Sequence, residues 1–426
     1  MHKIAVLLLG ALFALGVFAD DCVDCHRKVT PGAVADWEAS KHSTAEKDKA
    51  TCKTCHGKDH NTKDDAKLAK MPTAATCGGC HDKQQTQFEK GKHNQAWLAM
   101  TAMPTTHMLP AQMAAGQKGC GGCHKMGAKS KEEVAKLKAG GQHYGNASCD
   151  ACHTRHTFSK KEAQQPQACQ TCHMGFDHPQ WEMYSTSKHG TRALLKQLGV
   201  MPEKSVAPTC QTCHMQDGNH EVRTAWGFLA VRLPLSDDPQ WKADQITILQ
   251  ALGVLDLKGA PTGRLDAVKA ADVARLDQAS FDKERNKMIK TCAQCHSETF
   301  AKGELDKGDQ IIRQADHLLA DAIRIIAGLY KDGILAKPAG YASAFPDLLT
   351  FHDAPRPIEH KLFVMHLEHR MRTFQGTFHA NPDYALWYGW SEMLQDLAEI
   401  KEMAADLRAK HAMEKKASVK KTAAKK

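Results

Sequence analysis

Eight copies of the motif Cys-x-x-Cys-His constrain this chain of 426 residues more than any other feature of its sequence. In this motif two thiols attach a haem covalently, and the histidine that follows binds its iron. The eight copies use all 16 cysteines. They are Cys22/Cys25/His26, Cys52/Cys55/His56, Cys77/Cys80/His81, Cys120/Cys123/His124, Cys149/Cys152/His153, Cys169/Cys172/His173, Cys210/Cys213/His214 and Cys292/Cys295/His296. The sequence therefore predicts eight covalently attached c-type haems, and it leaves no cysteine for a disulfide, a zinc site or a redox dithiol.

The first 19 residues have the pattern of a secretory signal peptide. His2 and Lys3 precede an apolar run from residue 4 to residue 18, and Val17 and Ala19 are the small residues expected before a cleavage site. An uncleaved anchor is the alternative, but the run is too short to span a bilayer comfortably. We expect cleavage after Ala19 and a periplasmic protein.

The formal net charge of +9 falls once the haems are counted, because each haem brings two propionates. The net charge of the holoprotein, with its haems attached, is then expected to be close to zero. A nucleic-acid partner therefore has no support. The remaining lysine excess lies in residues 413–426, which have no apolar period, and we expect this tail to be disordered and solvated. Aromatic residues make up only 6% of the chain, and porphyrin rings can replace them in the core.

The uneven spacing of the motifs divides the chain into regions. Seven motifs crowd into a heptahaem region at 20–220, and an insert at 221–300 ends in the eighth. A C-terminal helical bundle is predicted at 301–412, because apolar residues recur every three or four positions between Gly308 and Tyr330, and similar patterns cover 358–374 and 384–411. We predict a mainly α fold: a multihaem cytochrome c with a haem-packed N-terminal part, whose folding depends on haem attachment, and a C-terminal helical bundle.

Counting histidines does not reveal whether any iron is open to substrate. The chain has 25 histidines, of which eight belong to the motifs. A haem that only carries electrons takes two strong axial ligands, whereas a catalytic haem needs one open position. The remaining histidines suffice for a second ligand at every iron, so both arrangements are possible on this count.

Several segments resemble the hydroxylamine oxidoreductase family of octahaem cytochromes. They are CDACHTRHTF at 149–158, CQTCHMGFDHPQW at 169–181 with SKHG at 187–190, CQTCHMQDGNH at 210–220, and RMRTFQG at 370–376. With eight motifs in this order, the resemblance covers nearly the whole mature chain.

This resemblance implies a helical, often trimeric, periplasmic protein with seven bis-histidine haems and one five-coordinate catalytic haem, the fourth along the chain. Here that haem would be held by Cys120, Cys123 and His124. The distal Asp-His pair of the family matches Asp177 and His178, which would pass protons to bound nitrogen oxides. The alternatives for this pair are a surface turn before Pro179, or His178 as an ordinary axial ligand.

The second axial ligands of the other seven haems are predicted from the remaining histidines. We predict His42, His60, His93, His156, His189, His220 and His317, with His143 and His107 as reserves. The histidines at 360, 366, 369 and 379 are assigned to helix packing or an interface.

The direction of the reaction depends on a tyrosine. Family members that oxidise hydroxylamine link a C-terminal tyrosine of a neighbouring subunit to the catalytic haem, and residues 362–376 contain no tyrosine to match it. We therefore expect a reductase that converts nitrite or hydroxylamine to ammonium, with a small cytochrome c or a membrane quinol-linked cytochrome as redox partner and a homotrimeric assembly. Oxidation of hydroxylamine or hydrazine through Tyr384 or Tyr388, a pure electron conduit and a structural cytochrome remain open. The absence of a C-x-x-C-K motif disfavours the neighbouring class of nitrite and tetrathionate reductases.

Overall fold

The computed structural model describes residues 21–47, 49–95, 121–124, 148–175, 178–226, 235–265, 277–337, 343–349 and 354–423. The predicted fold class is confirmed, because these residues form helices and turns and contain no strand. The helices up to residue 220 are short. They are α1 (Asp21–Val29), α2 (Pro31–Ala39), α3 (Lys41–Thr44), α4 (Cys52–His56), η1 (Lys63–Leu68), α5 (Ala74–Gly78), α6 (Asp82–Lys90), η2 (His93–Gln95), α9 (Gly121–His124), η4 (Cys149–Ala151), α11 (Lys160–Ala163), α12 (Gln167–Gln170), α13 (Gln180–Ser185), α14 (Lys188–Gln197), α15 (Cys210–His214) and η5 (Gln216–Gly218).

The helices after residue 235 are longer and form a bundle. They are α16 (Pro239–Ala251), α18 (Gln278–Cys292), α19 (Glu298–Lys331), α20 (Pro357–Val364), the π-helix η7 (Met365–His369), α21 (Arg370–Phe378), α22 (Pro382–Ala385), the π-helix η8 (Leu386–Trp390) and α23 (Ser391–Ala423). Helix α19 lies at the centre and packs on α16, α21 and α23. Its apolar stripe is fully buried, with Ile312, Leu319, Ile323 and Ile326 at 0% exposure.

The apolar core is concentrated in this bundle. Both clusters of buried apolar residues consist of residues from 225 onward. In the described part before residue 220, the buried apolar side chains are limited to Val23, Val34, Met183, Tyr184 and Ala193. Such a segment cannot bury enough apolar surface to fold on side chains alone, which agrees with the expected need for bound cofactors.

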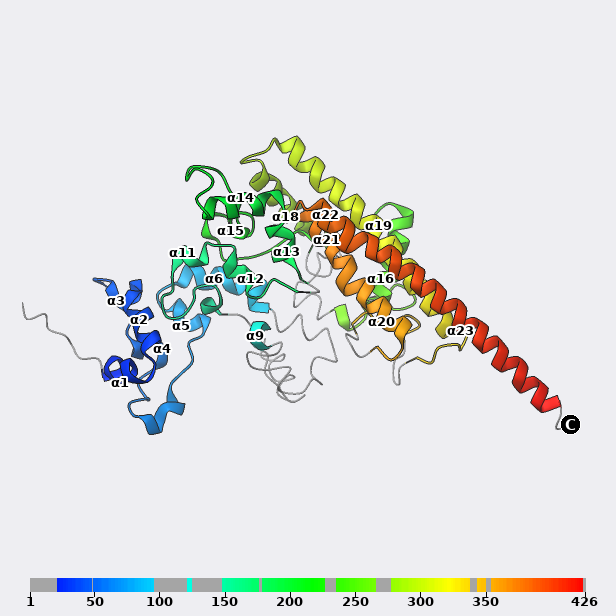
Figure 1. Cartoon of the computed structure of the whole chain (residues 1–426), viewed down its shortest axis with the longest axis horizontal. Helices are drawn as coiled ribbons and strands as arrows, with labels where there is room; N and C mark the ends of the chain where they lie inside the picture. The colour runs from blue at the N-terminus through cyan, green and yellow to red at the C-terminus, as the bar shows by residue number, and fades with distance from the viewer. Residues whose placement is uncertain are drawn as a thin grey trace, which may run out of the picture.

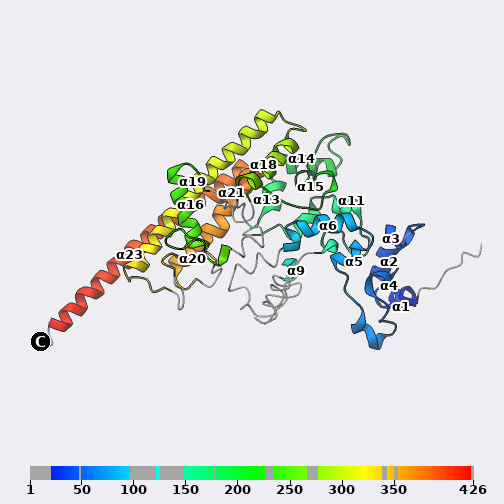
Figure 2. The same cartoon turned by 180° about the vertical axis from the view of Figure 1, so that it is seen from behind.

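The molecule is elongated, and its two ends differ in character. Helices α1 to α4 lie at one end, and the last turns of α23 project from the other end (Figures 1 and 2). The short helices α5, α6 and α11 to α15 lie between the N-terminal end and the bundle (Figure 1). None of the helices in the described ranges combines the length and the apolar character that a membrane crossing requires.

The prediction of a disordered basic tail was wrong for residues 413–423. Helix α23 continues through this segment to Ala423, with every described side chain exposed. The segment holds no glycine or proline and is rich in lysine and alanine, which favour helix even without an apolar face. The Ser418 hydroxyl donates to the Lys415 carbonyl at 2.8 Å within this helix.

Candidate haem-binding site

A single connected cavity of about 4040 Å³ runs through the N-terminal part of the molecule. Residues from all eight Cys-x-x-Cys-His motifs line it. An ordinary small-molecule pocket measures roughly 300–1,000 Å³, so this cavity has room for several large planar groups. Paired thiols and imidazoles on its wall are the donor set that c-type haem requires, and the residues present therefore fit this cofactor.

Local capping explains why the motifs form single helical turns. In α4 the Thr51 amide donates to the Thr54 hydroxyl at 3.1 Å, and in α15 Thr209 and Thr212 repeat this bond at 3.0 Å. In each case the second threonine stands between the two cysteines of its motif. This reciprocal cap stabilises a turn too short to be stable by itself. The turn holds both thiols and the histidine ready for one cofactor.

Seven of the motif histidines lie beside a second histidine from another part of the chain. The centres of the two rings are 5.9 to 6.3 Å apart in every pair. The pairs are His26 with His60, His56 with His156, His81 with His42, His153 with His220, His173 with His93, His214 with His379, and His296 with His189. Two imidazole nitrogens at about 2 Å from one metal ion, on opposite sides, place their ring centres roughly 6 Å apart. The spacing therefore suits one iron between each pair.

The structure brings six of the seven predicted second ligands to a motif histidine. These six are His42, His60, His93, His156, His189 and His220. Helix α14 shows how the chain positions one of them. The Ser187 hydroxyl caps this helix by accepting from the Gly190 amide at 3.2 Å, and a β-carbon at Gly190 would lie 1.9 Å from the Tyr184 carbonyl oxygen. Only glycine permits this approach, which seats α14 and its His189 against α13.

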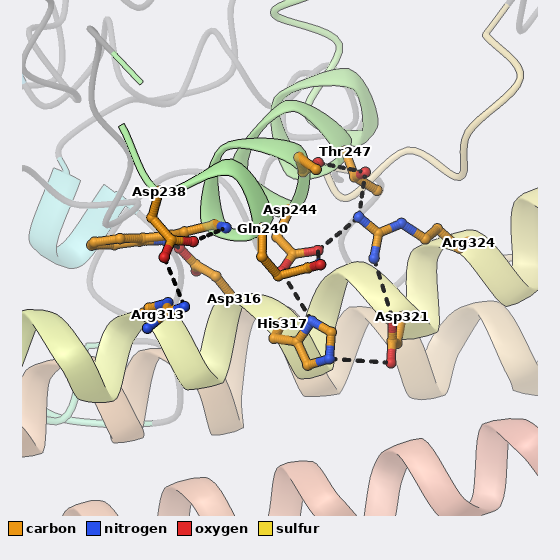
Figure 3. Close-up of polar contacts among 11 residues, drawn as sticks. Asp238, Gln240, Asp244, Thr247, Arg313, Asp316, His317, Asp321 and Arg324 are labelled. Carbon is orange, nitrogen blue, oxygen red and sulfur yellow. Dashed lines mark hydrogen bonds and ion pairs between the residues drawn. The ribbon is translucent and has the colours of Figure 1, made fainter. Parts of the chain in front are cut away.

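The prediction for His317 is corrected. This residue lies on α19, outside the lining of the cavity, and among the described residues no motif histidine stands beside its ring. Its Nδ1 lies 3.0 Å from Asp244 and its Nε2 3.9 Å from Asp321 (Figure 3). Asp244 is only 1% exposed, and a buried carboxylate requires polar partners. Arg324 supplies a positive charge, and the His317 ring supplies a hydrogen bond. His317 therefore belongs to an ion-pair network between α16 and α19.

His379 takes the place that the sequence analysis gave to His317. It follows the last turn of α21, and its ring centre is 6.3 Å from that of His214. Its Nδ1 bonds the Gln375 carbonyl at 2.7 Å, which orients Nε2 toward the cavity. The other histidines assigned to packing behave differently. His369 bonds Asp396 at 2.5 Å inside the bundle, His366 is fully buried and His360 is exposed.

We expect His379→Ala to convert one low-spin haem to a high-spin haem, because His214 would then be the sole imidazole at that iron. Electron paramagnetic resonance of the ferric holoprotein measures this change. His317→Ala is the matched control and should add no high-spin signal. The reverse pattern, a new signal in His317→Ala alone, would restore the assignment made from sequence.

Burial keeps the most enclosed motif histidines neutral. It lowers the pKa of His173 to about 3 and that of His214 to about 4. Neutral imidazole is the form that binds iron, so these rings bind metal without first losing a proton at neutral pH. Burial also lowers the pKa of their partners His93 and His379. Metal-free and metal-bound states thus require the same protonation of these four rings.

Contacts between cysteines show the order in which the motifs follow one another in space. The Cys77 and Cys149 thiols share a hydrogen bond, as do those of Cys169 and Cys210. Burial raises the pKa of Cys55, Cys152 and Cys213, and the charge of nearby thiols raises each further. These thiols are Cys77 and Cys80 for Cys55, Cys169 and Cys172 for Cys152, and Cys292 and Cys295 for Cys213. The motifs therefore follow the order second, third, fifth, sixth, seventh and eighth. We call this sequence of sites the motif row.

The first and fourth motifs join the motif row at different points. His60, which pairs with His26 of the first motif, lies four residues beyond His56 of the second, so the first motif stands at the N-terminal end of the row. Cys123 of the fourth motif has its Sγ 3.9 Å from the Thr171 carbonyl oxygen, inside the sixth motif. The fourth motif is therefore a branch beside the sixth, next to the segment that carries His178.

His178 lines the same cavity as Cys123 and His124. Its ring centre is 6.1 Å from that of His173, close to the spacing of the axial pairs. However, the Trp181 amide bonds the His173 carbonyl at 2.9 Å, which closes a short loop around His178. In the seven pairs the second histidine comes from a separate segment, as His93 does for His173. We therefore assign His93 to the sixth motif and leave His178 facing the cavity.

Some of the predicted site residues lie outside the described residues. They are Cys120 of the fourth motif, Asp177 of the Asp-His pair, the reserves His107 and His143, and the signal peptide at 1–19. Their assignments stay predictions.

Three comparisons relate the chain to known proteins. The protein family described as "Seven times multi-haem cytochrome CxxCH" matches residues 47–232 and 266–340. A probable nitrite reductase–hydroxylamine oxidoreductase fusion protein of Kuenenia stuttgartiensis is 27% identical over 483 residues, which cover 91% of this chain and 52% of that protein. The chain thus spans about half the length of this curated relative.

Two solved structures share the fold. One is a reducing HAO-like protein complex of Kuenenia stuttgartiensis, with a TM-score of 0.65 and 25% identity over 93% of this chain and 86% of that one. The other is a hypothetical multiheme protein, with a TM-score of 0.63 and 19% identity over 92% of this chain and 96% of that one. At this lower identity the second match shows the fold alone.

Proposed function

This chain belongs to the family of multihaem cytochromes with repeated CxxCH motifs, as the sequence predicted, and from this premise we propose that it reduces small nitrogen oxides at one of eight attached haems. The proposed reaction is the reduction of nitrite or hydroxylamine to ammonium. Nitrite takes up six electrons and eight protons to give ammonium and two water molecules, so the protein must deliver both electrons and protons to one place.

The observation that carries this proposal is the position of His178. This histidine lines the cavity together with Cys123 and His124, on the segment whose Thr171 carbonyl contacts Cys123. Histidine is the side chain that gains and loses protons nearest to neutral pH, so it suits proton delivery to a substrate bound beside the fourth motif. The preceding Asp177 would hold its tautomer, as the family resemblance implies.

The other histidines of the cavity serve electron transfer. A bound haem supplies an iron that changes its charge by one electron. Each of the seven histidine pairs would hold one haem iron with two imidazoles, which would keep small molecules away from that iron. Substrate is thereby directed to the fourth motif, and the motif row carries electrons toward it. The succession of neighbouring motifs in the motif row supports this role.

The name of the solved relative supports the reductive direction, since it is described as a reducing HAO-like protein complex. One observation favours the opposite direction as a second candidate. Tyr388 on the π-helix η8 is 54% exposed, with its ring 5.0 Å from that of Tyr384, so it could reach a neighbouring copy. In contrast, Tyr330 is buried and donates to Glu359. A link from Tyr388 to the fourth haem of another copy would suit hydroxylamine or hydrazine oxidation.

Activity and spectra of the purified holoprotein test these alternatives together. We expect ammonium from nitrite and from hydroxylamine with reduced methyl viologen as donor, together with one high-spin haem among eight. A tyrosine-linked haem would add an extra visible band after reduction and would overturn the reductive proposal, especially with rapid hydroxylamine oxidation. The absence of any high-spin haem, together with no turnover, would instead indicate an electron conduit.

Localisation and assembly complete the proposal. We place the protein in the periplasm after cleavage behind Ala19, with a small cytochrome c or a membrane quinol-linked cytochrome as electron donor. A homotrimer is the assembly that the family resemblance supports. The exposed apolar side chains of η8, Leu386 and Trp387, would lie in such an interface.

A further inference from the structure

The haem site at the N-terminal end of the motif row differs from the others in its second ligand. The Nδ1 of His60 lies 2.9 Å from Oδ1 of Asp65, while the Nδ1 of His26 lies 2.8 Å from the Thr30 hydroxyl. When Nε2 binds iron, Nδ1 carries the proton, so His60 donates this bond to a carboxylate. The second ligand of this site is therefore bonded to a full negative charge.

The Asp65 carboxylate is fixed by its own loop. The same Oδ1 accepts the backbone amides of Asn61 at 3.0 Å and Thr62 at 2.8 Å. Asp65 and His60 are both half-buried, with side-chain exposures of 28% and 23%. Asp65 lies in the first turn of η1, five residues before Lys70, whose carbonyl bonds His56. The carboxylate is thus held toward His60 by short local contacts, and the orientation of the ring follows from it.

Weaker acceptors stand at the other paired histidines. His56 and His379 face the backbone carbonyls of Lys70 and Gln375 at 2.9 and 2.7 Å, and His173 faces the side-chain oxygen of Gln180 at 3.2 Å. The Nδ1 atoms of His214 and His220 are buried and have no hydrogen-bond partner within the described ranges. Among the paired histidines of the described residues, only His60 bonds a carboxylate.

The acceptor at Nδ1 changes how strongly an imidazole donates electrons to iron. A carboxylate pulls the Nδ1 proton and makes the ring more basic, which stabilises the ferric state over the ferrous state. A neutral carbonyl acceptor stabilises the ferric state less than a carboxylate does. An imidazole without any acceptor stabilises it least. We propose that Asp65 makes the haem held by Cys22, Cys25 and His26 the lowest-potential bis-histidine haem of the chain. Its reduction takes up one electron from a one-electron donor and leaves the His60 proton in place.

This arrangement gives the N-terminal end of the molecule a defined role. Helices α1 to α4 lie at the end of the molecule opposite the projecting turns of α23 (Figure 1), and the first motif ends the motif row. An electron on this haem is held least firmly, so it passes to the second motif rather than remaining at the end. Asp65 is a positioning residue in this scheme, because it acts through His60.

The test compares Asp65→Asn with Asp64→Asn in the full holoprotein. Both changes remove one negative charge from η1, but Asp64 is exposed and makes none of the bonds described for Asp65. We expect Asp65→Asn to raise the midpoint potential of one haem of the eight, by a tenfold change in its equilibrium constant, or about 59 mV for a one-electron couple. Potentiometric titration followed by visible absorbance and paramagnetic resonance measures this.

A third variant assigns the shift to a particular haem. His60→Ala should remove the low-spin signal of one haem. The haem whose midpoint potential changes in Asp65→Asn must be the haem that gives this signal. The proposal fails if Asp64→Asn gives an equal shift, if no haem shifts, or if the shifted haem keeps its signal in His60→Ala. These potentials are measured without substrate, so the result is independent of whether the protein reduces nitrogen oxides.

Discussion

Replacing His178 with alanine should lower the rate of nitrite or hydroxylamine reduction by about 100- to 10,000-fold, the usual contribution of a positioned general acid. The reason is its place in the cavity beside Cys123 and His124, where it is the proton donor assigned to the fourth motif. All eight haems should stay attached, because His178 belongs to no Cys-x-x-Cys-His motif. Steady-state turnover with reduced methyl viologen, normalised to haem content, measures the loss.

Spectra of the same variant separate proton delivery from iron ligation. If His178 rather than His93 were the second ligand of the sixth haem, His178→Ala would add a high-spin signal at that haem. We expect no such change, and His93→Ala serves as the comparison that should produce one. Turnover equal to that of the unaltered protein would contradict the role of His178 as proton donor.

Replacing Asp316 with alanine should lower the free energy of unfolding of the C-terminal bundle by about 3–5 kcal/mol, as is usual when one partner of a buried ion pair is removed. Asp316 on α19 bonds Arg370 of α21 at 2.7 Å and the Trp241 indole of α16 at 2.8 Å. The two charged side chains are 3% and 1% exposed. An arginine does not lose its charge in a protein, so Arg370 would be left as a buried cation.

A same-helix control and a double variant make this prediction specific. Asp321 on α19 is 38% exposed and pairs with Arg324, so Asp321→Ala should cost under about 1 kcal/mol. Asp316→Leu combined with Arg370→Met should recover most of the lost stability, because it removes both buried charges. Thermal and urea unfolding followed by far-ultraviolet circular dichroism measure each variant. Equal losses for Asp316→Ala and Asp321→Ala would show that the buried pair contributes nothing special.

Apolar periodicity predicted the C-terminal helices well, because this signal is local. The pattern between Gly308 and Tyr330 falls inside α19, and that between 358 and 374 falls inside α20, η7 and α21. Periodicity was less informative where no face is buried. It gave no helix for residues 413–423, where α23 is helical and exposed.

The sequence predicted those parts of the candidate site best whose residues lie close together in the chain. Six second ligands were identified on histidines near other motifs or in segments that resemble the family. His379 was missed because it lies 165 residues beyond His214, directly after a helix whose pattern suits packing. His317 was predicted as a second ligand, yet its ring bonds Asp244 of another helix. The role of Asp65 also required coordinates, since the capping-box pattern of Thr62 and Asp65 marks the turn but does not reveal the contact of Asp65 with His60.

The sequence by itself determined the cofactor and its attachment points. Two thiols and a histidine within five residues are close enough for one haem in any fold. Each motif therefore predicts covalent haem attachment by itself. The tertiary structure decided which histidine stands beside each of seven motif histidines, which motifs are neighbours and which acceptor His60 meets. These depend on contacts between segments far apart in the chain, and such contacts form only when the helices and their cofactors pack together.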